Sequence, residues 1–138
     1  MGVDDKISIS SNDFRYYEDS SVALLITNGV ETALDNTVIM WLFGLAFVHA
    51  EDMKEQRLQA DYIIVFDIKS EVHSNRAIRY NVKLLQEQPN YVSEHKMVFI
   101  GSDCKLFNGR IYLIEAWNGE HTKDINKHNI TMLLPEEY

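Results

Sequence analysis

The segment 38–48 consists of apolar residues and one glycine, and it constrains the fold more than any other part of the chain. A bilayer crossing needs roughly twenty apolar residues, so a run of this length predicts a helix in a protein core. Asp35, Asn36 and Thr37 stand directly before the run and carry oxygen atoms that cap helix N-termini. We therefore expect one main helix that follows these residues and continues into the polar segment 51–57.

The predicted helix is apolar nearly all round in its first three turns, whereas a surface helix shows a single apolar stripe. Such a helix needs either a curved sheet and loops around it or contact with a second chain. Gly44 in its middle allows close approach of another backbone and costs about 1 kcal/mol in helix propensity. The candidates for self-association are Trp41, Phe43, Gly44 and Phe47.

Much of the remaining chain is rich in β-branched and aromatic residues, which are typical of strands. We predict strands at residues 22–27, 62–66, 78–84, 96–100, 110–117 and 130–134. The pair Asn108-Gly109 predicts a hairpin turn before the strand 110–117, because both residues tolerate positive φ. The fold class is therefore α+β: an antiparallel sheet of about five to seven strands packed on one main helix.

The length of 138 residues is typical of one domain, so residues 1–138 are expected to fold as a unit. Residues 1–13 are mostly small and polar, and we expect them to be loosely ordered. Cys104 is the single cysteine, so no disulfide within the chain can form. The acidic start of the chain is unlike a secretory signal. These features predict a cytoplasmic protein without a membrane segment.

The chain carries 13 Lys and Arg against 21 Asp and Glu, for a formal net charge of −8. The average surface therefore repels phosphate backbones, which disfavours nucleic-acid binding. Acidity of this kind either keeps a small protein in solution or directs it to a protein partner with a basic surface. Candidate residues for such a contact are Trp117 and Tyr138, which end apolar segments, and the acidic residues Glu51, Asp52, Glu136 and Glu137.

Motifs that would indicate catalysis are missing from the sequence. The six glycines form neither a phosphate-binding loop nor a dinucleotide fingerprint, and no cofactor is expected. The polar segment 118–128 contains His121, Asp124 and His128, whose imidazole and carboxylate groups are ligands that metals accept. A small metal-dependent enzyme using this loop is the alternative hypothesis. A third hypothesis, RNA or DNA binding at Arg79 and its basic neighbours, is the weakest on a chain of this charge.

Several segments resemble a known family in the same order along the chain. They include TNGV at residues 27–30, MWL at 40–42, QEQPNY at 86–91, IYLI at 111–114 and the ending TMLLPEEY at 131–138. In these segments the chain is similar to domain-of-unknown-function family 960, which comprises uncharacterised proteins of Gram-positive bacteria and their phages. The resemblance implies a bacterial or phage origin and a cytoplasmic protein. It implies no activity.

Taken together, the sequence favours a non-enzymatic, acidic protein-interaction module over an enzyme. Its partner is expected to be a protein with a basic surface, and the apolar helix adds the hypothesis of a homodimer. If the chain is borne by a phage, it is expected to inhibit a host protein that binds nucleic acid. The first reason is the net charge of −8, and the second is the lack of catalytic motifs.

Overall fold

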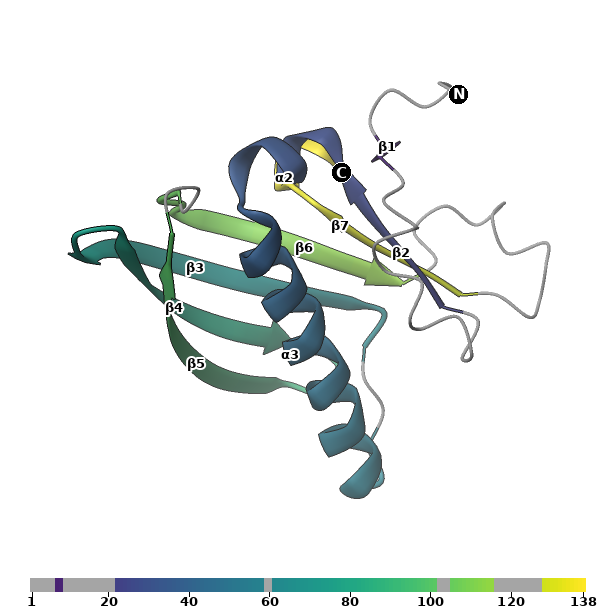
Figure 1. Cartoon of the computed structure of the whole chain (residues 1–138). Helices are drawn as coiled ribbons and strands as arrows, with labels where there is room; N and C mark the ends of the chain where they lie inside the picture. The colour runs from purple at the N-terminus through teal and green to yellow at the C-terminus, as the bar shows by residue number, and fades with distance from the viewer. Residues whose placement is uncertain (1–6, 9–21, 59–60, 102–104, 116–127) are drawn as a thin grey trace.

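The computed structural model describes residues 7–8, 22–58, 61–101, 105–115 and 128–138 (Figure 1). Its elements, in chain order, are β1 (Ile7–Ser8), β2 (Val22–Thr27), α2 (Asn28–Ala33), α3 (Asn36–Glu55), β3 (Ile63–Ser74), β4 (Ala77–Gln86), β5 (Tyr91–Ile100), β6 (Gly109–Glu115), β7 (His128–Leu133) and the 3₁₀ turn η3 (Pro135–Glu137). Within this part of the chain, no helix combines the length and the apolar character that a membrane crossing requires.

The main helix α3 confirms the prediction of one long helix in the first half of the chain. Its N-cap is Asp35, whose carboxylate accepts a hydrogen bond of 3.0 Å from the backbone N–H of Thr37. The helix runs for 20 residues and includes the polar residues after the apolar run. Its buried residues are Val38, Ile39, Leu42, Phe43, Ala46, His49 and Met53.

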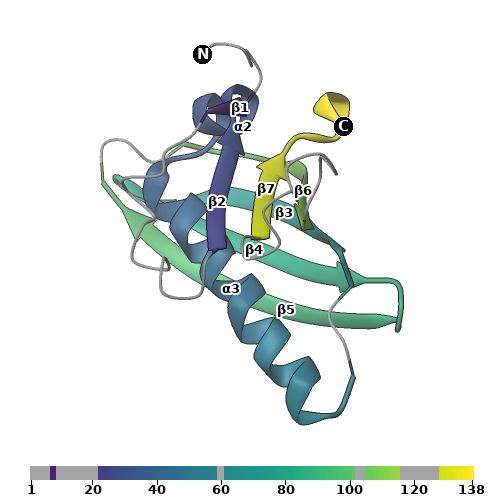
Figure 2. The same ribbon diagram turned by 90° about the vertical axis from the view of Figure 1, so that its right-hand side faces the viewer.

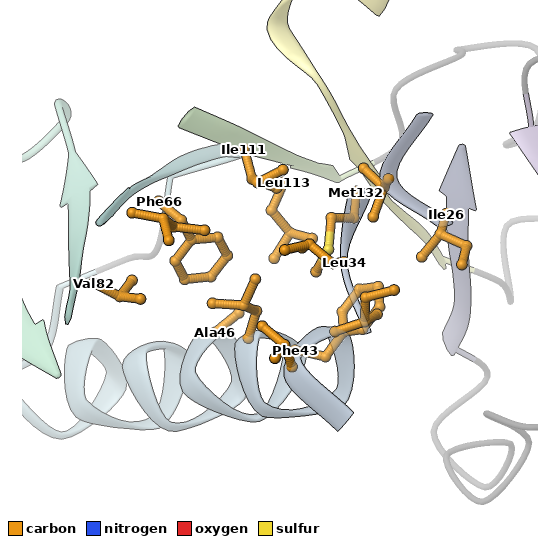
Figure 3. Packing of buried hydrophobic residues seen from close by; sticks show 14 of the residues in the cluster. Ile26, Leu34, Phe43, Ala46, Phe66, Val82, Ile111, Leu113 and Met132 are labelled. Atoms are coloured by element: carbon orange, nitrogen blue, oxygen red, sulfur yellow. The ribbon is translucent and has the colours of Figure 1, made fainter. Parts of the chain in front are cut away.

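The helix lies across one face of a seven-stranded sheet (Figures 1 and 2). Side chains from both layers form the core, and Figure 3 shows Phe43 and Ala46 of α3 pointing toward Phe66 and Leu113 of the sheet. Burial of this apolar surface is the main force that holds the helix on the sheet. The α+β class is therefore confirmed.

The sheet is mixed, so the prediction of a purely antiparallel sheet is wrong. The strand order is β1-β2-β7-β6-β3-β4-β5, and β2 and β7 run parallel, with Leu24 opposite Ile130 and Ile26 opposite Met132. The other strand pairs are antiparallel. The parallel pair arises because the α2–α3 crossover makes β2 and β3 run in the same direction. β7 inserts between β2 and β6, antiparallel to β6 and therefore parallel to β2.

The hairpin predicted at Asn108-Gly109 is also wrong. β5 pairs with β4, whereas β6 pairs with β3 and β7, so the strands before and after this turn are not neighbours. Gly109 does adopt a φ of +154°. The side-chain oxygen of Asn108 accepts a 2.8 Å hydrogen bond from the backbone N–H of Ser70, which ties the segment before β6 to β3.

Of the residues 1–13, only Ile7 and Ser8 lie in the described part of the chain. They form β1, which pairs with Thr27 and Ile26 at the end of β2. The other edge of the sheet is β5, which pairs with β4 along all ten of its residues. The sheet therefore presents one long edge strand, β5, and one face that α3 does not cover.

Candidate binding surface

Strand register places five apolar residues in one row across the uncovered face of the sheet. Side chains alternate between the two faces of a strand, so the neighbours of the core residues Phe66, Leu84 and Ile111 point away from α3. Leu133 lies opposite Tyr112, Tyr112 opposite Val65, Val65 opposite Leu85, and Leu85 opposite Val92. The exposure rises from buried Leu133 to Val92, which is 55% exposed at the edge strand.

A row of alternating charge runs beside this apolar row. Arg110 lies opposite Asp67, Asp67 opposite Lys83, and Lys83 opposite Glu94, one residue from each of β6, β3, β4 and β5. The Arg110 guanidinium is 3.8 Å from the Asp67 carboxylate, and the Lys83 ammonium is 3.9 Å from the Glu94 carboxylate. Because these pairs are exposed, each contributes little to stability, but they fix a repeating pattern of charge on the face.

The uncovered face contains two hollows, one beside each row. The larger, of about 600 Å³, lies over the apolar row, and the residues that line it include Tyr62, Leu85, Arg110, Tyr112 and Tyr138. The smaller, of about 290 Å³, lies over the charged residues and is lined by Asp67, Lys69, Asn81, Val82, Lys83, Glu94, His95 and Lys96. Polar residues such as Asp61, Gln86 and Asn90 share the lining of the larger hollow with its tyrosines and aliphatic residues. A mixed lining of this kind is typical of a surface that contacts another protein.

The C-terminus is held by a carboxylate clasp at Glu137. Its Oε1 accepts hydrogen bonds from the Thr27 hydroxyl at 2.5 Å and the Leu134 N–H at 2.8 Å, and its Oε2 accepts from the Gly29 N–H at 3.1 Å. Charge-assisted hydrogen bonds of this kind are about twice as strong as neutral ones. The clasp brings Tyr138 against Tyr112, with ring centroids 5.8 Å apart, and so completes one wall of the larger hollow.

A buried polar cluster around Gln86 supports the other end of the larger hollow. The amide oxygen of Gln86 accepts from His49 Nε2 at 2.6 Å and from the Asp61 N–H at 3.0 Å. Its amide nitrogen donates to the Pro89 carbonyl at 3.1 Å. Gln86 and His49 are 4% and 3% exposed, so both side chains depend on these protein partners for their hydrogen bonds. The cluster joins α3 to the start of β3 and to the β4–β5 turn.

His95 on β5 faces the side of the sheet that carries α3, and we expect it to make the stability of the protein depend on pH. Burial, with a smaller contribution from the charge of His49, holds its pKa below the usual value of 6.5. The unfolded chain therefore binds more protons near that pH, and the free energy of unfolding is expected to fall as pH drops below 6.5. We expect the free energy of unfolding, measured by denaturant titration, to fall less between pH 7.5 and pH 5.5 in His95→Gln than in the wild type. An equal loss in both proteins would contradict this assignment.

The residues that the sequence nominated for partner binding do not form one site. Tyr138 is 64% exposed on the larger hollow, and Glu136 is exposed beside it. Glu137 is occupied by the clasp within the chain. Glu51 and Asp52 are exposed on the second half of α3, which extends away from the C-terminus (Figure 1). Trp117 lies outside the described residues.

The four candidates for self-association point to different surroundings on α3. Phe43 is 1% exposed and belongs to the core, so it is not available to a second chain. The Trp41 ring packs against Phe99 of β5, with centroids 5.4 Å apart. Phe47 lines an apolar hollow of about 230 Å³ together with Ile64 and Leu113. The helix is therefore covered mainly by its own sheet.

Gly44 is the exception, because a Cβ added there would meet no atom within 4 Å. We expect Gly44→Ala to raise the free energy of unfolding by about 1 kcal/mol, since alanine favours the helix more than glycine does. Thermal unfolding measures the effect. Gly109→Ala is the matched control and is expected to destabilise the protein, because Gly109 has a φ of +154°. A destabilising Gly44→Ala would indicate that another chain packs closely on this helix.

The residues of the metal hypothesis fall outside the described part of the chain. This applies to His121 and Asp124 and to the side chain of His128, the first residue of β7. Among the described residues, no group of three or more His, Cys, Asp or Glu side chains could hold a metal ion. The basic group at Arg79 is described, but Tyr80 between its members is fully buried on the α3 side and cannot stack on a base.

Most residues of the uncovered face were not nominated from the sequence. Val65, Leu85, Val92, Arg110 and Tyr112 are ordinary strand residues there, and only their cross-strand register joins them. Residues 78–84 alternate between apolar and polar side chains, a pattern that is typical of a strand with one buried face.

Comparisons with known proteins place the chain in no family. No family model matches it, and no curated protein or solved structure matches it either. The resemblance to family 960 therefore stays a prediction from the sequence.

Proposed function

We propose that this chain is a non-enzymatic protein-interaction module that binds its partner on the uncovered face of the sheet. The observation that carries the proposal is the hollow of about 600 Å³ on this face, with three tyrosines, Tyr62, Tyr112 and Tyr138, among its lining residues. Tyrosine is enriched at protein interfaces because it offers a large apolar body and a polar tip. An apolar side chain of the partner would enter the hollow, and the adjacent charge row would fix its orientation.

The pairing of charges on this face favours a protein partner over a nucleic acid. Among the described residues of the face, three cations already have a carboxylate partner: Arg79 with Glu71 at 3.0 Å, Lys83 with Glu94 and Arg110 with Asp67. Phosphate groups would have to compete with these carboxylates on a chain of net charge −8. A protein surface with its own alternating charges can match the row without displacing either sign.

The net charge of the whole chain bears on the kind of partner. A charge of −8 attracts a basic protein from a distance and raises its rate of association at low salt. The exposed Glu51 and Asp52 on α3 add to this field away from the binding face. A partner that normally binds nucleic acid has such a basic surface, and the module would then act as its inhibitor.

Affinity capture from nuclease-treated lysate of the source organism tests the proposal. We expect the double variant Arg110→Ala, Tyr138→Ser to recover at least about tenfold less partner than the wild type, because both side chains border the hollow. Val48→Ser is the matched control, since Val48 is 57% exposed but lies on α3. Recovery should also fall at high salt. Loss of the partner in the control, its retention by the double variant, or no partner at all would contradict the proposal.

A further inference from the structure

The edge strand β5 leaves its outer side without a described neighbour. Among the described strands its ten residues pair with β4 only, so within that part of the chain its outward N–H and C=O groups have no strand partner. Several of its side chains are apolar and exposed: Val92 at 55%, Met97 at 42%, Val98 at 37% and Ile100 at 78%. Polar residues occupy its centre, where His95 stands between the charged residues Glu94 and Lys96. Central charges protect an edge from unselective pairing but permit a partner with matching charges.

The sequence of β5 is complementary to itself around His95. In an antiparallel pair of two such strands with a two-fold axis through His95, Glu94 faces Lys96 of the second copy and Val92 faces Val98. On the opposite face of the sheet, Tyr91 faces Phe99 and Ser93 faces Met97. The symmetry makes each of these pairs occur twice. Opposite charges, β-branched pairs and aromatic pairs are the cross-strand contacts that stabilise antiparallel strands.

The neighbouring symmetric registers are disfavoured. A two-fold axis through Glu94 would place the two copies of Glu94 opposite each other, and an axis through Lys96 would do the same with two lysines. Like charges directly opposite each other are destabilising, so the strand selects the register centred on His95. In this register the side chains of both copies that lie on the α3 side stay on one face of the joined sheet. A shift of the pairing by one residue would place them on opposite faces.

We propose that two copies of this chain associate through antiparallel pairing of β5 with β5 about a two-fold axis at His95. The two sheets become one continuous sheet, with both copies of α3 on the same face. The charge row of each copy continues across the axis, from Lys83 and Glu94 to Lys96 of the second copy. This dimer forms at the edge of the sheet and shares Val92 and Glu94 with the partner-binding face proposed above. It differs from the helix-mediated dimer that the sequence suggested.

Charge reversal tests the register. Sedimentation velocity measures the dimer of the wild type, of Lys96→Glu, of Glu94→Lys and of the double variant that carries both. We expect each single variant to weaken the dimer by about tenfold or more, because both symmetric charge pairs become repulsive. The double variant restores opposite charges at both pairs and should recover the dimer. The variants are expected to fold, because the ion pair that Glu94 forms with Lys83 within the chain is exposed. Circular dichroism of each variant checks this.

Disulfide trapping tests the position of the axis. In a Cys104→Ser background, His95→Cys places two thiols opposite each other at the axis, within the Cα separation that a disulfide accepts. Val92→Cys is the matched control on the same strand, because its two copies lie far apart in this register. We expect mild oxidation to cross-link the first variant and not the second. A monomer at all concentrations, no recovery in the charge-swapped variant, or preferential cross-linking at position 92 would each overturn the proposal.

Discussion

We expect Glu137→Ala to lower the free energy of unfolding by about 3 kcal/mol, because it leaves three hydrogen-bond donors without their charged acceptor. Those donors are the Thr27 hydroxyl and the N–H groups of Gly29 and Leu134. Thr27 is fully buried, so water cannot readily replace the carboxylate there. The melting temperature of the variant should fall by roughly 10 °C. Urea titration and thermal unfolding, each followed by circular dichroism, measure the change.

Glu136→Ala is the control for the clasp. Glu136 precedes Glu137 in the same 3₁₀ turn and is exposed, so its loss is expected to change stability by less than about 0.5 kcal/mol. Gly29→Ala should reproduce the loss, because a Cβ at this position would lie 2.5 Å from Oε2 of Glu137. Equal effects of Glu136→Ala and Glu137→Ala would show that the C-terminus is not held by the carboxylate.

The buried amide of Gln86 leads to the second large effect. Gln86→Leu removes the acceptor of His49 Nε2 and of the Asp61 N–H, and it removes the donor to the Pro89 carbonyl. Each buried polar group that loses its partner costs about 1–3 kcal/mol, so we expect a total loss of about 3 kcal/mol. Hydrogen exchange should also become faster at the start of β3 and in the β4–β5 turn, which the amide holds together.

Gln88→Leu controls for this second prediction. Gln88 lies two residues away and is exposed, and the contact it makes with Asp61 comes from its backbone N–H, which the substitution keeps. We expect its stability to stay within about 0.5 kcal/mol of the wild type. If Gln86→Leu were as stable as Gln88→Leu, the cluster around the amide would contribute nothing to the fold.

The sequence predicted the main helix and the approximate positions of the strands because those features depend on local pattern. Asp35 and the apolar run that follows it define the start of α3, and the strand predicted at 22–27 coincides with β2. The first half of β5, residues 91–95, was not predicted, because Ser93, Glu94 and His95 break the apolar alternation. Edge strands tolerate such polar residues, so their sequences resemble loops.

The direction and order of the strands could not be predicted from the same patterns. An isolated strand sequence does not state whether its neighbour runs parallel or antiparallel, and the parallel pairing of β2 with β7 joins the two ends of the chain. The turn residues Asn108 and Gly109 suggested a local hairpin. β6 instead pairs with β3, because α3 and the β3–β4–β5 meander leave that side of β3 free for a later strand.

The candidate site was predictable only in part, and the reason is that it is assembled by register. Tyr138 was nominated as a terminal aromatic residue, and it does lie on the larger hollow. The sequence nominated Glu137 for partner binding together with Tyr138. Its carboxylate instead accepts a hydrogen bond from Thr27, which is 110 positions away in the chain. The apolar row contains no residue that is unusual for a strand. The row exists only because the register of five strands brings one apolar residue of each strand side by side.

A photoreactive phenylalanine analogue placed at position 110 shows whether the uncovered face of the sheet binds a protein. Arg110 borders the larger hollow, and the matched position is Val48 on α3, which is 57% exposed. Irradiation in lysate of the source organism, followed by mass spectrometry, identifies what each position touches. We expect one dominant cross-linked protein from position 110, and we expect position 48 not to cross-link to that protein. Cross-linking of the same protein from position 48 alone, or of nucleic acid from position 110, would contradict the proposal.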